Sequence, residues 1–337
     1  MKDGAARRPS IYDVADRAGV SHMTVSRVLN GHPNIRESTR VKVLAAIDEM
    51  NFTRSTIARA LATSKAMRIG VLLDSPGQYG PNSILRAIEA AAREHGYSVS
   101  AFSIGDDERR RVDAGVVELL AQGVDGLCLI APRVSSLDVL RQQAAGVPLL
   151  VVTEEADPEI HTAAVDQRAG GHAAVRHLIE LGHRKILHLA GPDDWFDARA
   201  RAGAWRDELT AAGLEVVAPE VGDWSSDSGY EYGRTHDFGD ATAVFAANDQ
   251  MALGIVHGLM ERGLRVPDDI SVVGFDDLPD ARHFLPPLTT IRQDFPSLGR
   301  LVIRALLAAM EGDQGGVREL IAPSLVVRAS TGPLRSR

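Results

Sequence analysis

Two short helical patterns separated by a glycine stand near the start of the chain, and they limit its possible folds more than any other feature. Ser10 is a residue type that caps helices, and Asp13, three positions later, is placed to complete a capping box. The apolar residues that follow recur at the spacing of one helix face, and they are Ile11, Val14, Ala15 and Ala18. Gly19 then predicts a tight turn, because glycine adopts a positive φ without strain.

The second pattern begins at Ser21, again a capping residue, and its apolar positions Val25, Val28 and Leu29 predict an inward face. Two short helices around a glycine turn, with polar residues exposed near the start of the second helix, are typical of a helix-turn-helix. An α-hairpin whose Arg27 is only solvated has the same spacing, so the pattern alone leaves both interpretations open.

The outer face of the second helix suits the major groove of DNA. Arg27 matches the two acceptors of guanine, and His22 and Met23 would meet neighbouring base edges. Hydroxyl groups are better suited to phosphate oxygens, which fix the register of a protein on DNA rather than read its sequence. In this helix the hydroxyls belong to Ser21, Thr24 and Ser26.

A third helix is predicted at about 38–51, and it closes the small core of this segment. The residues expected to face that core are Val41, Leu44, Ala45 and Ile47. The basic residues left for the DNA backbone are Arg36, Arg40 and Lys42.

The distribution of charge supports a nucleic-acid partner for this segment. Residues 1–66 contain 11 Lys and Arg against 6 Asp and Glu, whereas the rest of the chain contains 26 against 39, within a net charge of −8. A phosphate polyanion attracts the first segment and is repelled by the second. A small basic head on an acidic body is therefore expected.

Beyond its general pattern, the run IYDVADRAGVSHMTVSRVLNG resembles, without a gap, the helix-turn-helix of the LacI/GalR family of bacterial transcription regulators. The run FTRSTIARAL at 52–61 resembles the hinge helix of that family, although Arg54 and Ser55 stand where the family often has Pro and Asn. The resemblance implies that Leu61 is a wedge between base steps in the minor groove, and a buried linker leucine is the alternative. The residues expected to contact DNA are Ser21, His22, Met23, Thr24, Ser26, Arg27, Asn30, Arg59 and Leu61.

From Met67 onward, short β-rich runs alternate with helical patterns, which predicts βαβ units and parallel sheets. Neither a glycine-rich dinucleotide fingerprint nor a Walker-type loop occurs. The expected strands are 68–73, 98–102, 126–130, 148–152, 185–190, 243–246 and 271–274, and the clearest helical patterns are 82–95 and 248–262.

This second part resembles the periplasmic-binding-protein-like sensor of the same family over about 68–332. The resemblance implies an all-α helix-turn-helix head followed by an α/β sensor of two parallel-sheet lobes joined by three crossovers, with an effector between them. The expected domains are a DNA-binding head at 1–51, a hinge helix and linker at 52–66, and an effector-binding and dimerisation body at 67–337. The first lobe would take about 68–166 and 296–322, and the second about 167–291 and 323–332.

Loops at the predicted strand ends carry side chains that match the effector contacts of the family. Carboxylate, amide and guanidinium groups suit the adjacent hydroxyls of a sugar, and an indole suits the C–H face of a pyranose ring. A carboxylate at Asp197 should disfavour phosphates and suit a neutral polyol. The residues expected to line the effector site are Tyr79, Pro81, Ile84, Asp197, Arg201, Trp224, Asn248, Asp276, Gln293 and Phe295.

Structural alternatives exist for four of these residues. Asp276 could cap a turn, Asn248 could be only a helix cap, Arg201 could be a surface residue, and Trp224 could be plain core.

We expect a repressor controlled by a neutral sugar, with a galactoside favoured over a purine. A regulator controlled by a protein co-regulator, and a repressor activated rather than released by sugar, are the alternatives. Catalysis is not expected, because no nucleophile–base pair or metal-spaced cluster accompanies the adjacent Asp276 and Asp277. A transport-type binding protein would have a signal peptide, which is not seen.

The expected assembly is a homodimer on a near-palindromic operator, because the chain has no leucine-heptad tail after the body. No cofactor and no membrane contact are expected, since apolar runs are short and Cys128 is the only cysteine. The cytoplasm is the expected compartment, with the nucleoid when the protein is bound to DNA.

Overall fold

The computed structural model describes residues 9–30, 32–52, 65–74, 77–104, 108–130, 146–154, 160–313 and 318–334. The chain divides into two compact units, Met1–Ala66 and Met67–Arg337, which we call the head and the body. Each unit is described by itself below.

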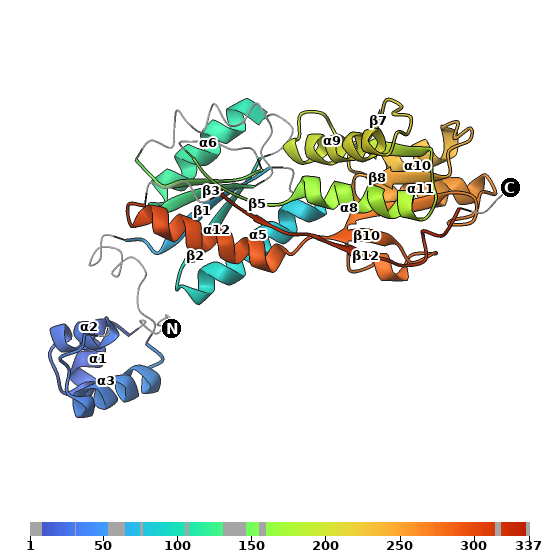
Figure 1. Ribbon diagram of the computed structural model, residues 1–337. Coiled ribbons are helices and arrows are strands. Elements are labelled where there is room, and N and C mark those ends of the chain that lie inside the picture. Colours follow the sequence, from blue (N-terminus) through green and yellow to red (C-terminus); the bar gives the residue numbers. More distant parts are fainter. Residues whose placement is uncertain are drawn as a thin grey trace, which may run out of the picture. The chain divides into compact units, whose positions relative to one another are not determined.

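The head contains three helices, α1 (Ile11–Ala18), α2 (His22–Leu29) and α3 (Glu37–Glu49) (Figure 1). The predicted capping box at the start of α1 is present, with Ser10 accepting from the Asp13 amide and Asp13 accepting from the Ser10 amide. Gly19 ends α1 at φ 66°, in the left-handed region that favours glycine. Ser21 caps α2 through its side chain, as its sequence position predicts.

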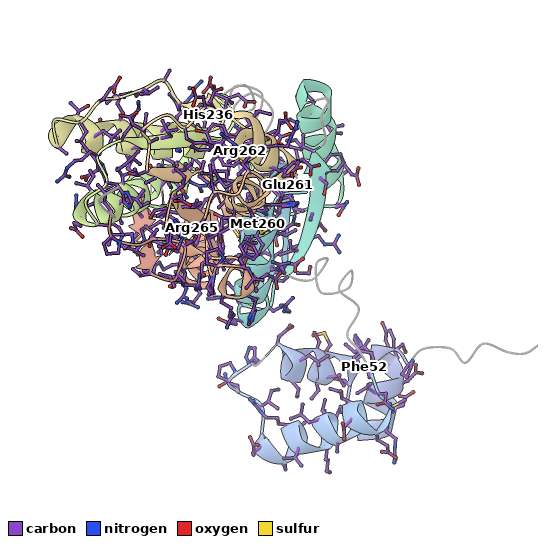
Figure 2. All side chains as sticks on the ribbon, turned by 90° about the vertical axis from the view of Figure 1, so that its right-hand side faces the viewer. Phe52, His236, Met260, Glu261, Arg262 and Arg265 are labelled. Carbon is purple, nitrogen blue, oxygen red and sulfur yellow. The ribbon has the colours of Figure 1, made fainter. Side chains whose placement is uncertain are left out.

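The prediction for the inward face of α3 is confirmed for Ile47, which packs against the head core, and is wrong for the other three residues. Val41 and Leu44 are 57% and 51% exposed, and Ala45 is also exposed, whereas Val43 and Ala46 are buried. The sequence carries two apolar stripes one residue apart, and α1 and α2 pack against the second of them. That stripe continues through partly buried residues of the head core, which are Ile47, Met50 and, past the helix end, Phe52 (Figure 2).

The body is built on two six-stranded sheets. We call the first sheet and its helices lobe 1, and its strand order is β11-β5-β4-β3-β1-β2. Its strands, all paired in parallel, are β1 (Arg68–Asp74), β2 (Ser98–Ile104), β3 (Gly126–Ile130), β4 (Leu149–Val152), β5 (His161–Val165) and β11 (Arg318–Ile321).

Lobe 2 is the second sheet with its helices, in the order β12-β10-β9-β8-β6-β7. Only β12 runs antiparallel to its neighbour. The strands are β6 (Ile186–Ala190), β7 (Glu220–Val221), β8 (Ala243–Ala246), β9 (Ser271–Asp276), β10 (Thr289–Arg292) and β12 (Ser324–Val326).

Helices cover both faces of each sheet (Figure 1). In lobe 1, α5 (Tyr79–Glu94) and α12 (Phe295–Met310) pack together on one face and α6 (Glu108–Ala121) covers the other. In lobe 2, α8 (Gln167–Glu180) and α9 (Phe196–Ala211) cover one face, while α10 (Ser226–Thr235) and α11 (Asp249–Glu261) cover the other; a short 3-10 helix, η1 (Ala281–His283), follows β9.

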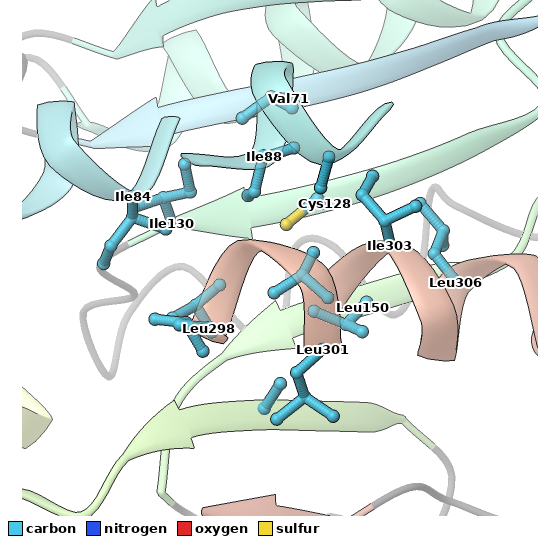
Figure 3. Packing of buried hydrophobic residues seen from close by; sticks show 14 of the residues in the cluster. Val71, Ile84, Ile88, Cys128, Ile130, Leu150, Leu298, Leu301, Ile303 and Leu306 are labelled. Carbon is cyan, nitrogen blue, oxygen red and sulfur yellow. The ribbon is translucent and has the colours of Figure 1, made fainter. Parts of the chain in front are cut away.

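Burial of apolar side chains on both sheet faces explains the near-continuous apolar strands. In lobe 1, alternate residues of β1 point to opposite sides, so Val71 faces the α5 and α12 core while Leu72 faces the α6 core. Figure 3 shows the first of these cores, where Ile88 of α5 and Leu301 of α12 close over Cys128 of β3.

Three chain crossovers join the lobes, at 165–167, 292–295 and 321–324. The first and third are bonded together, because the Asp166 amide donates to the Ile321 carbonyl at 2.9 Å. Across the described ranges, no helix is both long and apolar enough to cross a membrane.

Candidate functional sites: the exposed head helix and the interlobe cavity

The start of α2 presents a set of polar side chains on its outer face. Ser21, His22, Met23, Arg27 and Asn30 are exposed. The side chain of Arg27 forms neither an ion pair nor a hydrogen bond with the part of the chain that is described. A guanidinium left without an internal partner is available for an external acceptor.

Two of the three hydroxyl residues predicted to contact DNA are less exposed than Ser21. Thr24 and Ser26 are half-buried, and the Thr24 hydroxyl lies 3.0 Å from the Ser21 hydroxyl. The ring of His22 lies 5.0 Å from the ring of Tyr12 on α1, so the two helices share an exposed aromatic edge. Arg59 and Leu61, the hinge residues of the prediction, lie outside the described residues.

A cavity opens between the two lobes of the body, and its empty space, open solvent included, is about 530 Å³. Its lining comes from α5 and β4 of lobe 1 and from loops and helix starts of lobe 2, and comprises Gln78, Tyr79, Gly80, Pro81, Ile84, Val152, Trp195, Asp197, Arg201, Trp224, Asn248, Asp276 and Gln293.

Nine of the ten residues predicted to line an effector site therefore surround one cavity. The exception is Phe295, which is 7% exposed and belongs to the apolar core of lobe 1. Its ring meets the Tyr79 ring edge-on at 6.0 Å, so it supports a lining residue from behind. The helix predicted at 82–95 already begins at Tyr79, so Tyr79, Pro81 and Ile84 lie on the first turn and a half of α5.

Arg201 is buried, which excludes the surface alternative for this residue. Its Nε donates to Gln167 Oε1 at 2.9 Å and its Nη1 donates to the Ala247 carbonyl at 2.6 Å. The guanidinium carbon lies 3.8 Å from the centroid of the Phe275 ring, in cation–π contact. These contacts fix the guanidinium plane at the cavity wall.

Two carboxylates flank that guanidinium. Nη2 of Arg201 lies 3.9 Å from Asp197 Oδ2, one helical turn earlier, and 3.9 Å from Asp276 Oδ1 at the end of β9. Burial raises the pKa of Asp276 to about 6, against the opposing effects of Arg201 and of the Gln293 hydrogen bond. Burial likewise raises the pKa of Asp197, and Arg201 opposes it. When Asp197 and Asp276 are both ionised, their two negative charges exceed the single positive charge of Arg201.

Asp276, at the end of β9, and its neighbour Asp277 have different partners, and both residues have a positive φ. Asp276 accepts from Gln293 Nε2 at 2.6 Å, whereas Asp277 accepts from Arg328 Nη2 and Arg292 Nε, both at 2.6 Å. Asp276 has φ 112°, an unusual conformation for a side-chain-bearing residue. It is therefore no turn cap, and the two carboxylates do not form an acid–base pair.

Asn248 both caps a helix and lines the cavity. Its Oδ1 accepts from the Met251 amide at 2.9 Å, and its Nδ2 donates to the Trp224 carbonyl at 3.0 Å. Trp224, at φ 72° and 5% exposed, meets the Trp195 ring edge-on at 5.4 Å. Its indole Nε1 is buried and has no hydrogen-bond partner within the described ranges. Trp224 is thus a cavity wall with an unused donor.

Sequence reasoning missed several residues of this region. Trp195 lies between the end of β6 and Arg201, so its position in GPDDWFDARAR was an available signal. Glu154 follows β4 and accepts from the Gln167 and Arg168 amides at the start of α8. Burial, then Asp197 and Asp166, raises its pKa to about 8. Gln167 lies directly behind the cavity, and no local pattern marks either residue.

A metal centre finds no support in the ranges that the structure describes, where no group of three or more His, Cys, Asp and Glu could hold an ion. The cavity lining offers fixed hydrogen-bond acceptors, one guanidinium, side-chain amides and indole rings.

Comparison with known proteins assigns both parts of the chain. The family model described as bacterial regulatory proteins, lacI family, matches residues 10–55, and the model for a periplasmic binding protein-like domain matches residues 175–331. The lactose operon repressor of Escherichia coli (strain K12) is 38% identical over 326 residues, covering 96% of this chain and 90% of that protein. The HTH-type transcriptional repressor PurR of Haemophilus influenzae (strain PittEE) is 33% identical over 333 residues, covering 95% and 98%.

A solved structure gives the same result for the whole chain. The lac repressor dimer bound to operator and the anti-inducer ONPF has a TM-score of 0.83 to this chain at 36% identity. The match covers 97% of this chain and 100% of that one. The head and the two-lobed body thus have counterparts in the same known protein.

Proposed function

Because the chain belongs to the lacI family of bacterial regulatory proteins and is a DNA-binding transcriptional repressor, we propose that a small neutral sugar held in the interlobe cavity controls its affinity for an operator. The relatives named above are repressors rather than enzymes, and we propose no catalytic role.

The observation that carries this proposal is the group of Arg201, Asp276 and Gln293 in the wall of the cavity, with the Trp224 ring beside it, its centroid 5.7 Å from the Arg201 guanidinium carbon. A sugar hydroxyl both donates and accepts, and a guanidinium beside a carboxylate matches two such hydroxyls. The indole provides an apolar wall for the C–H face of a pyranose. Two carboxylates around one guanidinium oppose phosphorylated or acidic ligands.

Within the neutral sugars we propose a galactoside or a related carbohydrate. Support comes from the overall similarity to the lactose operon repressor. PurR is also similar over nearly the whole chain, so family alone does not choose the effector.

In the head we propose that α2 enters the major groove. The contacting residues would be Ser21, His22, Met23, Thr24, Ser26, Arg27 and Asn30, with Arg59 and Leu61 of the hinge segment at the minor groove. Arg27 is exposed and has no ion pair or hydrogen bond with the described residues, which suits bidentate contact with guanine.

We further propose that the working form is a homodimer on a near-palindromic operator. Large apolar side chains are exposed around the end of α11, with Leu285 87% and Met260 63% exposed. Figure 2 shows Met260 among Glu261, Arg262 and Arg265 on this face. A hollow of about 720 Å³ lies there, lined by Val256, Met260, Gly263, Leu264, Arg265, Val266, Leu285 and Pro286. A second copy would remove this apolar surface from water.

Ligand between the lobes would change their relative rotation and so the spacing of the two heads of the dimer, releasing the operator. The test is fluorescence anisotropy on labelled promoter DNA with a panel of galactosides, glucosides and pentoses at one stated salt concentration. We expect one neutral sugar class to release the DNA, and Arg201→Ala to abolish release without weakening DNA binding.

Two results would contradict the proposal in different ways. DNA binding that no sugar changes would point to another effector, with a protein co-regulator as the leading candidate. Sugar that tightens DNA binding would keep the site and reverse the sign of control.

A further inference from the structure

Four buried side chains form a closed ring beside the cavity. Arg201 Nε donates to Gln167 Oε1 at 2.9 Å, and Gln167 Nε2 donates to Gln293 Oε1 at 3.0 Å. Gln293 Nε2 donates to Asp276 Oδ1 at 2.6 Å, and the same oxygen lies 3.9 Å from Arg201 Nη2. Three of these residues line the cavity, and Gln167 is the only one of the four that does not.

The hydrogen bonds of this ring can run in one direction only. A guanidinium has donors and no acceptor, and an ionised carboxylate has acceptors and no donor. The two amides between Arg201 and Asp276 must therefore each turn an oxygen toward the arginine side and a nitrogen toward the carboxylate side. Reversing either amide would bring two donors or two acceptors together, at a cost that burial increases.

Gln167 is held at both of its ends. Its side chain is 3% exposed, and its backbone amide donates to Glu154, which follows β4 in lobe 1. Asp166, the preceding residue, caps α8 by accepting from the Ala169 amide at 2.7 Å. Gln167 therefore lies at the first crossover, and its side-chain amide donates to Gln293 at the second crossover.

The ring also decides which atoms remain for an occupant of the cavity. Asp276 Oδ1 and Arg201 Nε are used inside the ring, and Arg201 Nη1 is bonded to the Ala247 carbonyl. Asp276 Oδ2 and Arg201 Nη2 form no hydrogen bond with the described residues, so they remain as an acceptor and a donor for adjacent hydroxyls. Nη2 also lies 3.9 Å from Asp197 Oδ2. The relative placement of Asp276 Oδ2 and Arg201 Nη2 depends on Gln293 and therefore on Gln167.

We propose that Gln167 is a positioning residue of the cavity, which orients Arg201 and Gln293 for carbohydrate binding without touching the carbohydrate. This inference rests on the proposed function, because it concerns the same cavity and the same class of effector.

The first test uses the full-length protein and two replacements of similar length. Gln167→Met removes both hydrogen bonds, whereas Gln167→Glu keeps the acceptor for Arg201 and loses the donor to Gln293. Gln122→Met and Gln122→Glu are the matched controls, since Gln122 is exposed on lobe 1. The probes are D-galactose, methyl β-D-galactopyranoside, D-glucose and cellobiose, each titrated against the protein on its promoter DNA.

Both Gln167 variants should bind the DNA as wild type does in the absence of sugar. They should need about 10-fold more of the active sugar for half-release, the size expected for a lost hydrogen bond to a charged or buried group. The Gln122 variants should respond as wild type does. Release of wild type and Gln167 variants at the same sugar concentration overturns this inference alone. A wild-type protein that no sugar releases overturns the carbohydrate proposal, and this inference falls with it.

A second test needs no sugar, and it determines whether the hydrogen bonds of the ring have a fixed donor-to-acceptor direction. Gln167→Glu forces Gln293 to turn its oxygen toward Asp276, so it should lower the thermal unfolding midpoint. In the Asp276→Asn background, the new amide can donate to that oxygen, and Gln167→Glu should lower the midpoint much less. Equal losses in the two backgrounds would show that the ring has no preferred direction and would overturn the inference.

Discussion

The indole ring of Trp224 lies directly against Gly191, so closely that a β-carbon on Gly191 would be 2.2 Å from two of the ring atoms. Gly191 directly follows β6, and because it has no side chain, the Trp224 ring can lie against its backbone and form part of the cavity wall. The shape of the cavity therefore depends on a contact between the Gly191 backbone and the Trp224 ring, which are 33 positions apart in the sequence.

Gly191→Ala should displace Trp224 and weaken sugar binding by about 10-fold or more, because the wall of the cavity moves while the DNA-binding head is untouched. Tryptophan fluorescence should change in the sugar-free protein, and operator affinity should stay at the wild-type value. Gly77→Ala is the control, since nothing lies within 4 Å of a β-carbon at that position. Unchanged fluorescence and unchanged sugar affinity in Gly191→Ala would refute this account of the wall.

Arg27→Ala should weaken operator binding by roughly 10- to 100-fold, the value of one bidentate contact with a base. The loss should be largest on the native operator and smaller on unrelated DNA, because a base contact carries sequence information. Anisotropy titrations at two salt concentrations measure both quantities. Arg234→Ala serves as the control, since Arg234 is an exposed body residue paired with Glu231. An equal loss on all sequences would mean that Arg27 contacts only phosphate.

Sugar affinity should rise by about 10-fold between pH 5 and pH 7 as the Asp276 carboxyl, whose pKa burial raises to about 6, becomes an ionised acceptor. Asp276→Asn should bind sugar weakly and lose most of this dependence. Titrations at several pH values on one protein preparation provide the comparison. A wild-type affinity that is flat across this range would contradict a direct role for the ionised carboxylate.

His188 should make the body sensitive to acid. Its ring is 1% exposed, stacks on Phe245 at 4.7 Å, and contacts the Phe245 carbonyl through Nδ1 at 2.8 Å. Burial lowers the pKa of His188 to about 4, so the unfolded chain binds a proton more readily between pH 6.5 and 4. The stability from this group is complete above pH 6.5 and is lost as the pH falls, by at most about 3 kcal/mol.

His188→Leu should therefore show a shallower fall in the free energy of unfolding between pH 6.5 and pH 4, as measured by urea unfolding. His257→Leu, at a histidine whose side chain is 55% exposed, should keep the wild-type slope. The same steep slope in His188→Leu would assign acid sensitivity to other groups.

Leu285→Asp should convert the dimer to a monomer, because a charge would replace an 87% exposed apolar side chain at the proposed contact. Operator affinity should fall with it, since one head contacts only half of a palindrome. Sedimentation at several protein concentrations gives the assembly state. Val216→Asp, at a 38% exposed position away from that face, is expected to stay dimeric. A monomeric wild type would refute the proposed interface at once.

The local chemistry of the sequence was sufficient for the first two helices of the head and the turn between them. The capping box at Ser10 and the turn at Gly19 depend on residues within four positions of one another, so they can be read directly. Doubly wound sheets bind ligands beyond the carboxyl ends of their strands, which indicated the loops, and the resemblance to the family indicated that Arg201 and Asp276 in those loops line one cleft.

Tertiary packing determined which of several similar side chains are buried and which partners they contact, where the local sequence pattern allowed more than one answer. Helix α3 has two apolar stripes, and only the placement of α1 and α2 determines that Val43 rather than Leu44 is buried. Phe295 has the right position along the chain for the cavity, yet its ring packs beneath Tyr79 because the first turn of α12 faces the lobe 1 core. Gln167 has no distinguishing neighbours in sequence, and its role arises from partners 34 and 126 positions away. Periodicity reports which residues share a face, whereas only the packed chain determines what that face meets.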